Sequence, residues 1–588
     1  MALPRTAAMF VAAAALRCST PSPAPGTMDA AVDATVAEVA PFCTPGAVEC
    51  GADGLSPRTC DALGSAWTEG RRCDGPGGEV CDRGACVRAC EGLARESRGC
   101  EFWPVQTLHP ELGRFVDGAN RDDFPFSVVV SNPWPSAVRV TLEGGGLAAP
   151  LERTVGPNTS LVLETPWQPA LVDGVDHLHR QSAVFAHAAL HLRTSAPVSA
   201  YQFNPLKTIR EPECDLGDRC YSFSSDASLL LPATALGREH VVAAMPTQRA
   251  LGPGSTEWSV GAGFIAVVGT VAGTQVTVRL AGDVSAGDGI AAGGMGTART
   301  FTLGAGDVLQ LLSPTSGECP ADAYDRITQT RFCLPIARED LTGTVVTATQ
   351  PVAVFSGHEC AFVPYDRYAC DHLEEQVPPV DTLGTRYVVS RVAPVPEGLR
   401  DHPEGEPTAA TVIAAHDGTD VTFDPPSVHA PVRLDRGQSV PVLSALDYQV
   451  TASQPVLVAV FEVGGDYFRQ EVAVTANSYG DPELSYETPV DQYRARYDFY
   501  VPPDYESFVN VVIARGETLR LDDALVTAAP AATLGARDIY RLPILAGAHH
   551  VTGTNPGSRF GLRVYGFAPY TSYMYPGGMD LVSIAPPL

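Results

Sequence analysis

Cysteine content is the feature that most narrows what this chain can fold into. Eight of its 15 cysteines are crowded into residues 43–100, among glycine, proline and aspartate and with few aliphatic residues. Such a stretch cannot build a hydrophobic core alone, so disulfides must hold it, each by about 2 to 4 kcal/mol. The eight are Cys43, Cys50, Cys60, Cys73, Cys81, Cys86, Cys90 and Cys100. We therefore predict a disulfide module in an oxidising compartment outside the cytosol.

A zinc module is the competing interpretation of residues 43–100. Zinc knuckles need two cysteines separated by two residues, with further cysteine or histidine ligands nearby. Neither that gap nor a histidine occurs in this stretch. Disulfides are therefore expected in place of a metal.

The first residues resemble an export signal. Arg5 supplies a short positive region, residues 7–16 are small and apolar, and a proline-rich segment follows Cys18. Cleavage just before Cys18 would match bacterial lipoprotein processing, with the cysteine lipidated and residues 19–42 acting as a linker. Simple secretion is the alternative, because Arg17 is unusual at such a cleavage point. Setting Cys18 aside leaves 14 cysteines (15 minus 1), an even number that can pair completely.

The charge balance excludes two classes of partner. Acidic residues outnumber basic ones by 67 to 40, so the surface field repels nucleic acid and anionic lipid headgroups. We expect no nucleic acid partner, and membrane contact only through a lipid on Cys18.

From Phe102 onward, apolar runs are punctuated by glycine and proline, which is typical of short strands ended by turns. Only 18% of residues are charged, whereas the chain has 55 glycines and 50 prolines, a composition that favours sheets over long helices. Clear strand candidates are residues 126–130, 138–142, 161–163, 264–269 and 276–280. The body is therefore predicted to be all-β.

A weak internal repeat divides the body into related units. Residues 347–355 closely match residues 451–459, and residues 194–201 are a third copy; in all three, proline precedes valine. Leu-Gly pairs recur at positions 236–237 and 383–384, ahead of Gly-Thr hairpins. The proline is expected to begin a strand there, because at that position it removes no ladder hydrogen bond.

One unit alone offers enough strands for a β-sandwich. Its candidates are residues 387–390, 411–415, 421–424, 432–434, 439–443, 448–453 and 456–461, and a more divergent last unit has candidates at 508–514 and 561–567. We predict an export signal at 1–18, a linker at 19–42, the disulfide module at 43–100, and tandem sandwich-like modules at 102–205, 228–357, 374–463 and 485–588. A propeller-like arrangement is the alternative.

The six remaining cysteines form close pairs in polar, loop-like sequence. They are Cys214 with Cys220, Cys319 with Cys333, and Cys360 with Cys370. Local bridges that stiffen these loops are expected, with exchange between neighbouring pairs as the alternative. Rigid loops at the edge of a sandwich are a common place for recognition.

Histidines give no clear catalytic or metal site. His187 and His191 have the spacing of a helical zinc site, but their surroundings predict a strand, on which they lie about 13 Å apart. His358 and Glu359 beside Cys360 resemble an acid/base pair with a nucleophile, but a disulfide to Cys370 removes the nucleophile. We expect no catalytic residues and no cofactor.

Acidic turns leave structural calcium as an alternative. Residues 417–420 (Asp-Gly-Thr-Asp) and 120–123 (Asn-Arg-Asp-Asp) offer carboxylate and carbonyl oxygens. Neither has the ordered spacing of a calcium loop, and Asp-Gly is also the favoured hairpin turn.

The order of the strand phrases resembles the IgGFc-binding protein N-terminal domain family. The phrases lie at residues 229–232, 263–268, 343–347 and 350–358, and the resemblance covers roughly residues 124–567. It implies an extracellular binding protein, and the family includes bacterial surface proteins and lipoproteins with Cys-rich segments. The von Willebrand-type modules of the animal protein that gives the family its name are not found in this sequence.

These patterns favour a cell-surface or secreted binding or adhesion protein that recognises an extracellular protein or glycan, without catalysis. Its location is expected to be outer-membrane or cell-surface lipoprotein, or secreted. Two alternatives stay open. A hydrolase of extracellular polymer would need two acidic side chains facing each other in a deep cleft. A passive envelope component would have a flat surface without grooves.

Overall fold

The computed structural model describes most of the chain from Cys43 onward. The described residues are 43–588 without 52, 76, 111–119, 174–179, 212–213, 257, 327, 394–406, 466, 468–479 and 556. The predicted export signal, linker and Cys18 lie outside the described residues. There are two compact units: unit 1 contains described residues 43–47 and 60–67, and unit 2 contains 48–59 and the chain from 68 onward. In the described part, no helix is long and apolar enough to cross a membrane.

Disulfides hold residues 43–100, as predicted. One bond in unit 1 joins Cys43 to Cys60, and three bonds in unit 2 join Cys50 to Cys81, Cys73 to Cys86 and Cys90 to Cys100. The strands here are β1 (Val48–Cys50), β2 (Pro57–Cys60), β3 (Trp67–Glu69), β4 (Glu79–Asp82), β5 (Ala85–Arg88) and β6 (Gly99–Phe102). The apolar cluster of unit 2 in this region is Leu55 packed among cysteine side chains. Disulfides therefore take the place of a hydrophobic core in this region.

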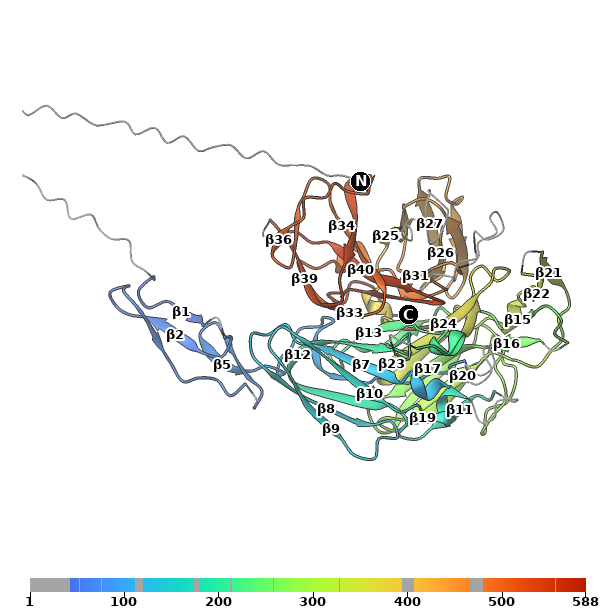
Figure 1. Ribbon diagram of the computed structural model, residues 1–588, viewed down its shortest axis with the longest axis horizontal. Coiled ribbons are helices and arrows are strands. Elements are labelled where there is room, and N and C mark those ends of the chain that lie inside the picture. The colour runs from blue at the N-terminus through green and yellow to red at the C-terminus, as the bar shows by residue number, and fades with distance from the viewer. Residues whose placement is uncertain are drawn as a thin grey trace, which may run out of the picture. The chain divides into compact units, whose positions relative to one another are not determined.

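The body of unit 2 consists of four successive groups of strands, which confirms the all-β prediction (Figure 1). Group 1 contains β7 (Phe126–Ser131), β8 (Val138–Gly144), β9 (Leu151–Val155), β10 (Ser160–Thr165), β12 (Leu190–Phe203) and β13 (Ala227–Leu230). Group 2 contains β11 (Ala183–Phe185), β14 (Gly237–Val241), β17 (Gly263–Gly269), β18 (Thr274–Arg279), β19 (Ala298–Leu303), β20 (Val308–Leu312), β23 (Val345–Phe362) and β24 (Cys370–Gln376).

Groups 3 and 4 are each made of two sheets. Group 3 contains β25 (Arg386–Val389), β26 (Thr408–Ala414), β27 (Thr419–Asp424), β28 (Val432–Leu434), β29 (Ser439–Ser444), β30 (Tyr448–Ala452), β31 (Val456–Phe461) and β32 (Leu484–Tyr486). Group 4 contains β33 (Arg496–Val501), β34 (Glu506–Ala514), β35 (Leu519–Leu521), β36 (Ala524–Leu525), β37 (Ala532–Leu534), β38 (Arg537–Ile544), β39 (Gly547–Gly553), β40 (Gly561–Ala568) and β41 (Thr571–Pro576). The sheet orders are β25-β30-β27-β28 with β29-β26-β31-β32, and β33-β39-β35-β36 with β37-β38-β34-β40-β41.

The sandwich interpretation is confirmed by the burial pattern of these strands. In β27, Val421 and Phe423 are buried while Asp420 and Thr422 are exposed, so one face of its sheet packs inward and the other faces solvent. Short helices connect the strands: η2 (Arg121–Asp123), α1 (Pro169–Val172), η3 (Gly217–Cys220), η4 (Ala337–Glu339), η5 (Val380–Thr382) and η6 (Val490–Gln492).

The repeated proline marks the point where the chain changes its partner strand. In group 3, β30 ends at Ala452 and β31 begins at Val456 directly after Pro455, as predicted. In group 1, β12 is continuous through Pro197: residues 190–194 pair with β8, and residues 199–203 pair with β7. Group 2 repeats this arrangement in β23 around Pro351. The prediction that proline begins a strand is therefore wrong for Pro197 and Pro351, where the strand bends and keeps going.

A glycine–proline contact joins neighbouring groups. A Cβ added to Gly237 would lie 2.2 Å from the Cβ of Pro379, and one added to Gly384 would lie 2.4 Å from the Cβ of Pro489. The contact recurs between Gly99 and Pro232, again at 2.2 Å. Each proline follows the last strand of a group. The Leu-Gly pairs of the repeat are thus explained by close packing that admits no side chain at the glycine.

The last strands of the four groups contact one another at the centre of the body. β13 contacts β24 and β41, and β32 contacts the same two strands. Groups 1 and 4 also share one hydrophobic core, in which the rings of Tyr201 and Tyr575 lie 4.7 Å apart. These four strands, β13, β24, β32 and β41, are called the central strands below. The four groups therefore form one closed assembly around them.

Candidate recognition face

Each central strand is reached through a hairpin connection from the strand before it. The described residues of these connections are 204–211 and 214–226 before β13, 363–369 before β24, 462–465, 467 and 480–483 before β32, and 569–570 before β41. Hydrogen bonds link the ends of these connections: Thr571 and the backbone N–H of Ser225 both donate to Asp371, at 2.8 and 3.1 Å. The four connections therefore lie at one end of the central strands, which we call the loop face.

Buried carboxylates tie the central strands together beneath the loop face. Asp226 accepts backbone hydrogen bonds from Glu374 in β24 (2.8 Å) and Leu484 in β32 (3.3 Å). Glu374 accepts from the side chains of Gln202, Asn204 and Ser228 at 2.7 to 2.9 Å. Because each acceptor lies on a different group from its donors, this network fixes the groups relative to one another.

Burial disfavours the charged form of these carboxylates. It raises the pKa of Asp226 and of Asp371 well above the usual range, against hydrogen bonds that lower it. Burial likewise raises the pKa of Glu374 to about 7. No solvent reaches these side chains, so their role is to hold the fold together, and none is placed to act on a substrate.

Three disulfides brace the loop face and its neighbourhood. Cys214 is bonded to Cys220 within the first connection, and Cys360 is bonded to Cys370 across the β23–β24 hairpin. The third bond, between Cys319 and Cys333, lies in an additional sheet of β15 (Gln248–Leu251), β16 (Ser259–Gly261), β21 (Asp322–Asp325) and β22 (Thr330–Cys333). Phe332 of that sheet packs edge-on against Phe362 of β23, with ring centroids 5.0 Å apart. The sheet is therefore anchored to the β23–β24 hairpin.

The prediction that all these cysteines lie in loops is wrong for three of them. Cys333, Cys360 and Cys370 lie in strands β22, β23 and β24. The bonds consequently hold strand ends together, and the connection 363–369 is short because the strands continue almost to its tip.

Aromatic side chains gather at two places on the loop face. Beside the Cys214–Cys220 bond, the ring of Tyr570 lies 4.8 Å from that of Phe223 and 5.2 Å from that of Tyr221. Phe223 and Tyr570 have φ angles of 53° and 66°, a backbone region in which bulky residues are strained. Such strain persists where the surroundings enforce it, which is common at binding sites.

The second aromatic group lies around the other two disulfides. Tyr324 is 57% exposed and Tyr368 is 43% exposed. The guanidinium of Arg331 lies over the ring of Trp258 (5.8 Å), and that of Arg367 lies over the ring of Tyr467 (5.8 Å). Tyrosine, tryptophan and arginine are the side chains that most often carry binding energy at protein interfaces.

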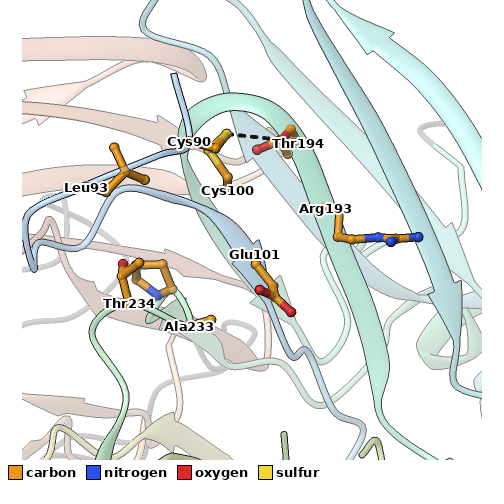
Figure 2. A pocket seen from close by; sticks show the side chains of 9 residues that line it. Cys90, Leu93, Cys100, Glu101, Arg193, Thr194, Ala233 and Thr234 are labelled. Carbon is orange, nitrogen blue, oxygen red and sulfur yellow. Dashed lines mark hydrogen bonds between the residues drawn. A yellow bond between two sulfur atoms is a disulfide. The ribbon is translucent and has the colours of Figure 1, made fainter. Parts of the chain in front are cut away.

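A pocket lies at the opposite end of β13 from the loop face. It has a volume of about 260 Å³. It is lined by the Cys90–Cys100 disulfide, Leu93, Glu101, Arg193, Thr194 and residues 232–234 (Figure 2). The Sγ of Cys90 lies 3.5 Å from the carbonyl oxygen of Thr194. Nothing in the sequence indicated this pocket, because β6, β12 and the turn after β13 meet there only in the folded chain.

The histidine pair considered from sequence is not a metal site. His187 lies in the turn between β11 and β12, with a φ of 52°, and not in a strand as predicted. His191 lies in β12, where its Nε2 donates to Glu101 (2.8 Å) and its ring stacks on Trp103 (4.1 Å). Among the residues that the structure describes, no three His, Cys, Asp or Glu side chains are grouped so that they could hold a metal ion.

The other acid/base candidates are also engaged in the fold. The Nδ1 of His358 accepts from the backbone N–H of Cys360, and Arg180 forms a buried ion pair with Glu359. In the two acidic turns, Asp420 pairs with Arg433 (2.9 Å), and Asp123 pairs with Arg210 (3.0 Å). These carboxylates neutralise arginines, so they are not gathered around a common empty centre.

Comparison with known proteins relates this chain to one family. A family model described as "IgGFc binding protein" matches residues 226–566. The "IgGFc-binding protein" of Homo sapiens is 33% identical to this chain over 171 residues, which are 29% of this chain and 2% of the human protein. The matched stretch is thus a very small part of that relative.

Proposed function

The chain belongs to the IgGFc binding protein family, and we propose that it is an exported binding protein that recognises an extracellular protein or glycan through the loop face. The observation that carries the proposal is the convergence of disulfide-braced connections and partly exposed aromatic rings at one end of the central strands. The family match begins at Asp226, next to β13, and therefore covers most of the strands that support this face.

Rigidity is the physical reason why this face suits recognition. A mobile loop loses conformational entropy when it binds, whereas a disulfide-bonded connection is ordered beforehand. Tyrosine and tryptophan add large contact areas with few rotatable bonds. Tyr324 and Tyr368 already face solvent, so a partner can cover them without rearranging the protein.

We further propose that the protein acts without catalysis. The hydrolase alternative needs two acidic side chains facing each other across a solvent-filled cleft. Among the described residues, carboxylates that lie close to one another, such as those of Asp226 and Glu374, are fully buried. The pocket at Cys90–Cys100 is lined by a single acid, Glu101. This distribution favours binding over hydrolysis.

We place the protein outside the cytosol, secreted or anchored through a lipid on Cys18. Fourteen cysteines of the described residues form seven disulfides, which require an oxidising compartment to persist. All cysteines of the described residues are therefore paired, and Cys18 lies outside that part of the chain. Mass spectrometry of the mature N-terminus tests this: a diacylglyceryl cysteine supports the anchor, and a start after residue 18 supports secretion.

Binding to panels of extracellular proteins and glycans, with an Fc fragment among the proteins, tests the recognition proposal. Replacing both Tyr324 and Tyr368 by serine should weaken binding of any partner found by about 30-fold, because loss of central aromatic contacts costs about 2 kcal/mol. Val271→Ser is the matched control, since Val271 is 46% exposed and follows Gly269, which pairs with Val352 at the end of the sheet away from the β23–β24 hairpin. A partner whose affinity is lowered by Val271→Ser and untouched by the tyrosine variant would contradict the proposal.

Lysine provides an independent test of where a partner binds. The sequence contains a single lysine, Lys207, in the first connection of the loop face. An amine-reactive cross-linker should therefore join a bound partner protein to the peptide containing Lys207, and Lys207→Arg should abolish that product. Cross-links confined to the N-terminal amine would place the partner elsewhere.

A further inference from the structure

The pocket at the Cys90–Cys100 disulfide combines an apolar wall with one carboxylate. Its apolar wall consists of the disulfide, Leu93, Pro232 and Ala233, and Glu101, Arg193, Thr194 and Thr234 complete the lining. Its volume of about 260 Å³ is below the range of roughly 300 to 1,000 Å³ that holds drug-sized ligands. A pocket of this size fits one amino-acid side chain.

The charges around the pocket leave a net negative group facing it. Arg193 is paired with Glu143 (2.7 Å), and in Figure 2 its side chain points away from Leu93 and Thr234. Arg95, close to the turn after β13, is paired with Asp381. Glu101 forms an ion pair with a histidine, His191, and its side chain is 46% exposed; Arg193 also acts on its charge. The hydrogen bond from His191 lowers the pKa of Glu101, which keeps the carboxylate ionised at neutral pH.

We propose that this pocket binds the side chain of a lysine presented by a partner protein. The aliphatic stem packs against Leu93, Pro232 and the disulfide, and the ammonium group donates to Glu101. Long cationic side chains combine an apolar stem with a charged end, which matches a pocket with an apolar wall and one acid. The site is separate from the loop face, so it adds a second contact to the proposed function and does not depend on it.

One observation favours lysine over arginine. Guanidinium groups bind carboxylates best through two parallel hydrogen bonds, which need both oxygens. His191 already donates to Oε1 of Glu101, so a guanidinium would have to share that oxygen, whereas a compact ammonium needs only Oε2. The net charge of −27 at pH 7 steers basic partners of either kind toward this chain.

Binding of Nα-acetyl-lysine N-methylamide to the full chain tests the site, measured by saturation-transfer NMR. The norleucine analogue, which has the same stem without the ammonium, should bind at least tenfold more weakly. Glu101→Gln should weaken lysine binding at least fivefold, and Thr234→Trp, at an exposed position of the pocket rim, should abolish it by filling the space. Glu152→Gln is the matched control, because Glu152 is an exposed acid on β9 outside the pocket.

The outcomes separate the parts of the proposal. Equal binding of the lysine and norleucine probes would overturn the role of Glu101. Lysine binding that survives both Glu101→Gln and Thr234→Trp would overturn the location. Tighter binding of the arginine analogue would overturn the ammonium class. Melting temperatures of the variants within a degree or two of the unmodified chain would show that each loss of binding reflects the pocket and not unfolding.

Discussion

Replacing Gly237 by alanine tests how tightly the strand groups are joined. The added Cβ would lie 2.2 Å from the Cβ of Pro379. Carbon atoms approach favourably only to about 3.5 Å, so the two backbones must separate by about 1.3 Å. Neither atom can turn away by a rotamer change, because both are fixed to the backbone. Overpacking costs about 1 to 3 kcal/mol, and we expect the upper end here, about 3 kcal/mol.

Scanning calorimetry measures the effect, with Gly252→Ala as the matched control because an added Cβ there meets no atom within 4 Å. The four groups form one compact unit of about 500 residues, for which an unfolding entropy of about 2.1 cal/mol/K per residue gives about 1 °C per kcal/mol, so Gly237→Ala should lower the melting temperature by about 3 °C. Adding Pro379→Gly removes the second Cβ and should recover part of the loss. If Gly237→Ala and Gly252→Ala melt at the same temperature, the reasoning from close packing is refuted.

Three further perturbations address the buried network, a disulfide and an ion pair. Burial raises the pKa of Glu374 from 4.5 to about 7, so the folded state keeps a proton that the unfolded chain releases. Glu374 should therefore contribute a fall in stability of up to about 3 kcal/mol as the pH rises from about 4.5 to about 7, and Glu374→Gln should remove that share of the difference in urea unfolding between pH 5 and pH 8. Replacing Cys360 and Cys370 together by alanine opens a loop with a sequence separation of 10 and should lower the free energy of unfolding by about 3 kcal/mol in guanidinium titrations; an unchanged midpoint would show that the strands alone hold the hairpin. Arg180→Met removes the cation paired with Glu359, and both side chains are at most 8% exposed. The variant should therefore destabilise the protein by about 3 to 5 kcal/mol in the same titration. Adding Glu359→Gln removes the unpaired carboxylate and should restore part of the lost stability.

Local patterns predicted the strands well. The candidates at 432–434 and 456–461 coincide with β28 and β31, and most other candidates differ from the observed strands by one to three residues at an end. Alternating or continuous apolar residues determine which face is buried, and that information is local. Local patterns could not predict which strands continue through a proline, because β12 and β23 pair with a different strand on each side of the proline and bend only when both partners are present.

The central strands were harder to predict because their burial depends on the whole assembly. β24 reads Cys-Asp-His-Leu-Glu-Glu-Gln, a polar sequence typical of an exposed strand, yet Asp371 to Gln376 are all buried. Their partners come from other groups, such as Ser225, Thr571 and Gln202, which are distant in sequence. The cysteine pairs predicted which connections are held by disulfides. That these connections lie on one face could not be predicted, because it depends on how the four groups pack around the central strands.

The core that groups 1 and 4 share bears on how the chain reaches its native state. Tyr201 of group 1 finds Tyr575 only after nearly the entire polypeptide has been made. A newly synthesised first group therefore lacks part of the core that it shares with the fourth group. Its apolar surface stays exposed to water until the strands of the fourth group have been synthesised. Maturation should then occur in one late step after the whole chain is available, and fragments ending before β33 should be recovered mainly as aggregates or degradation products.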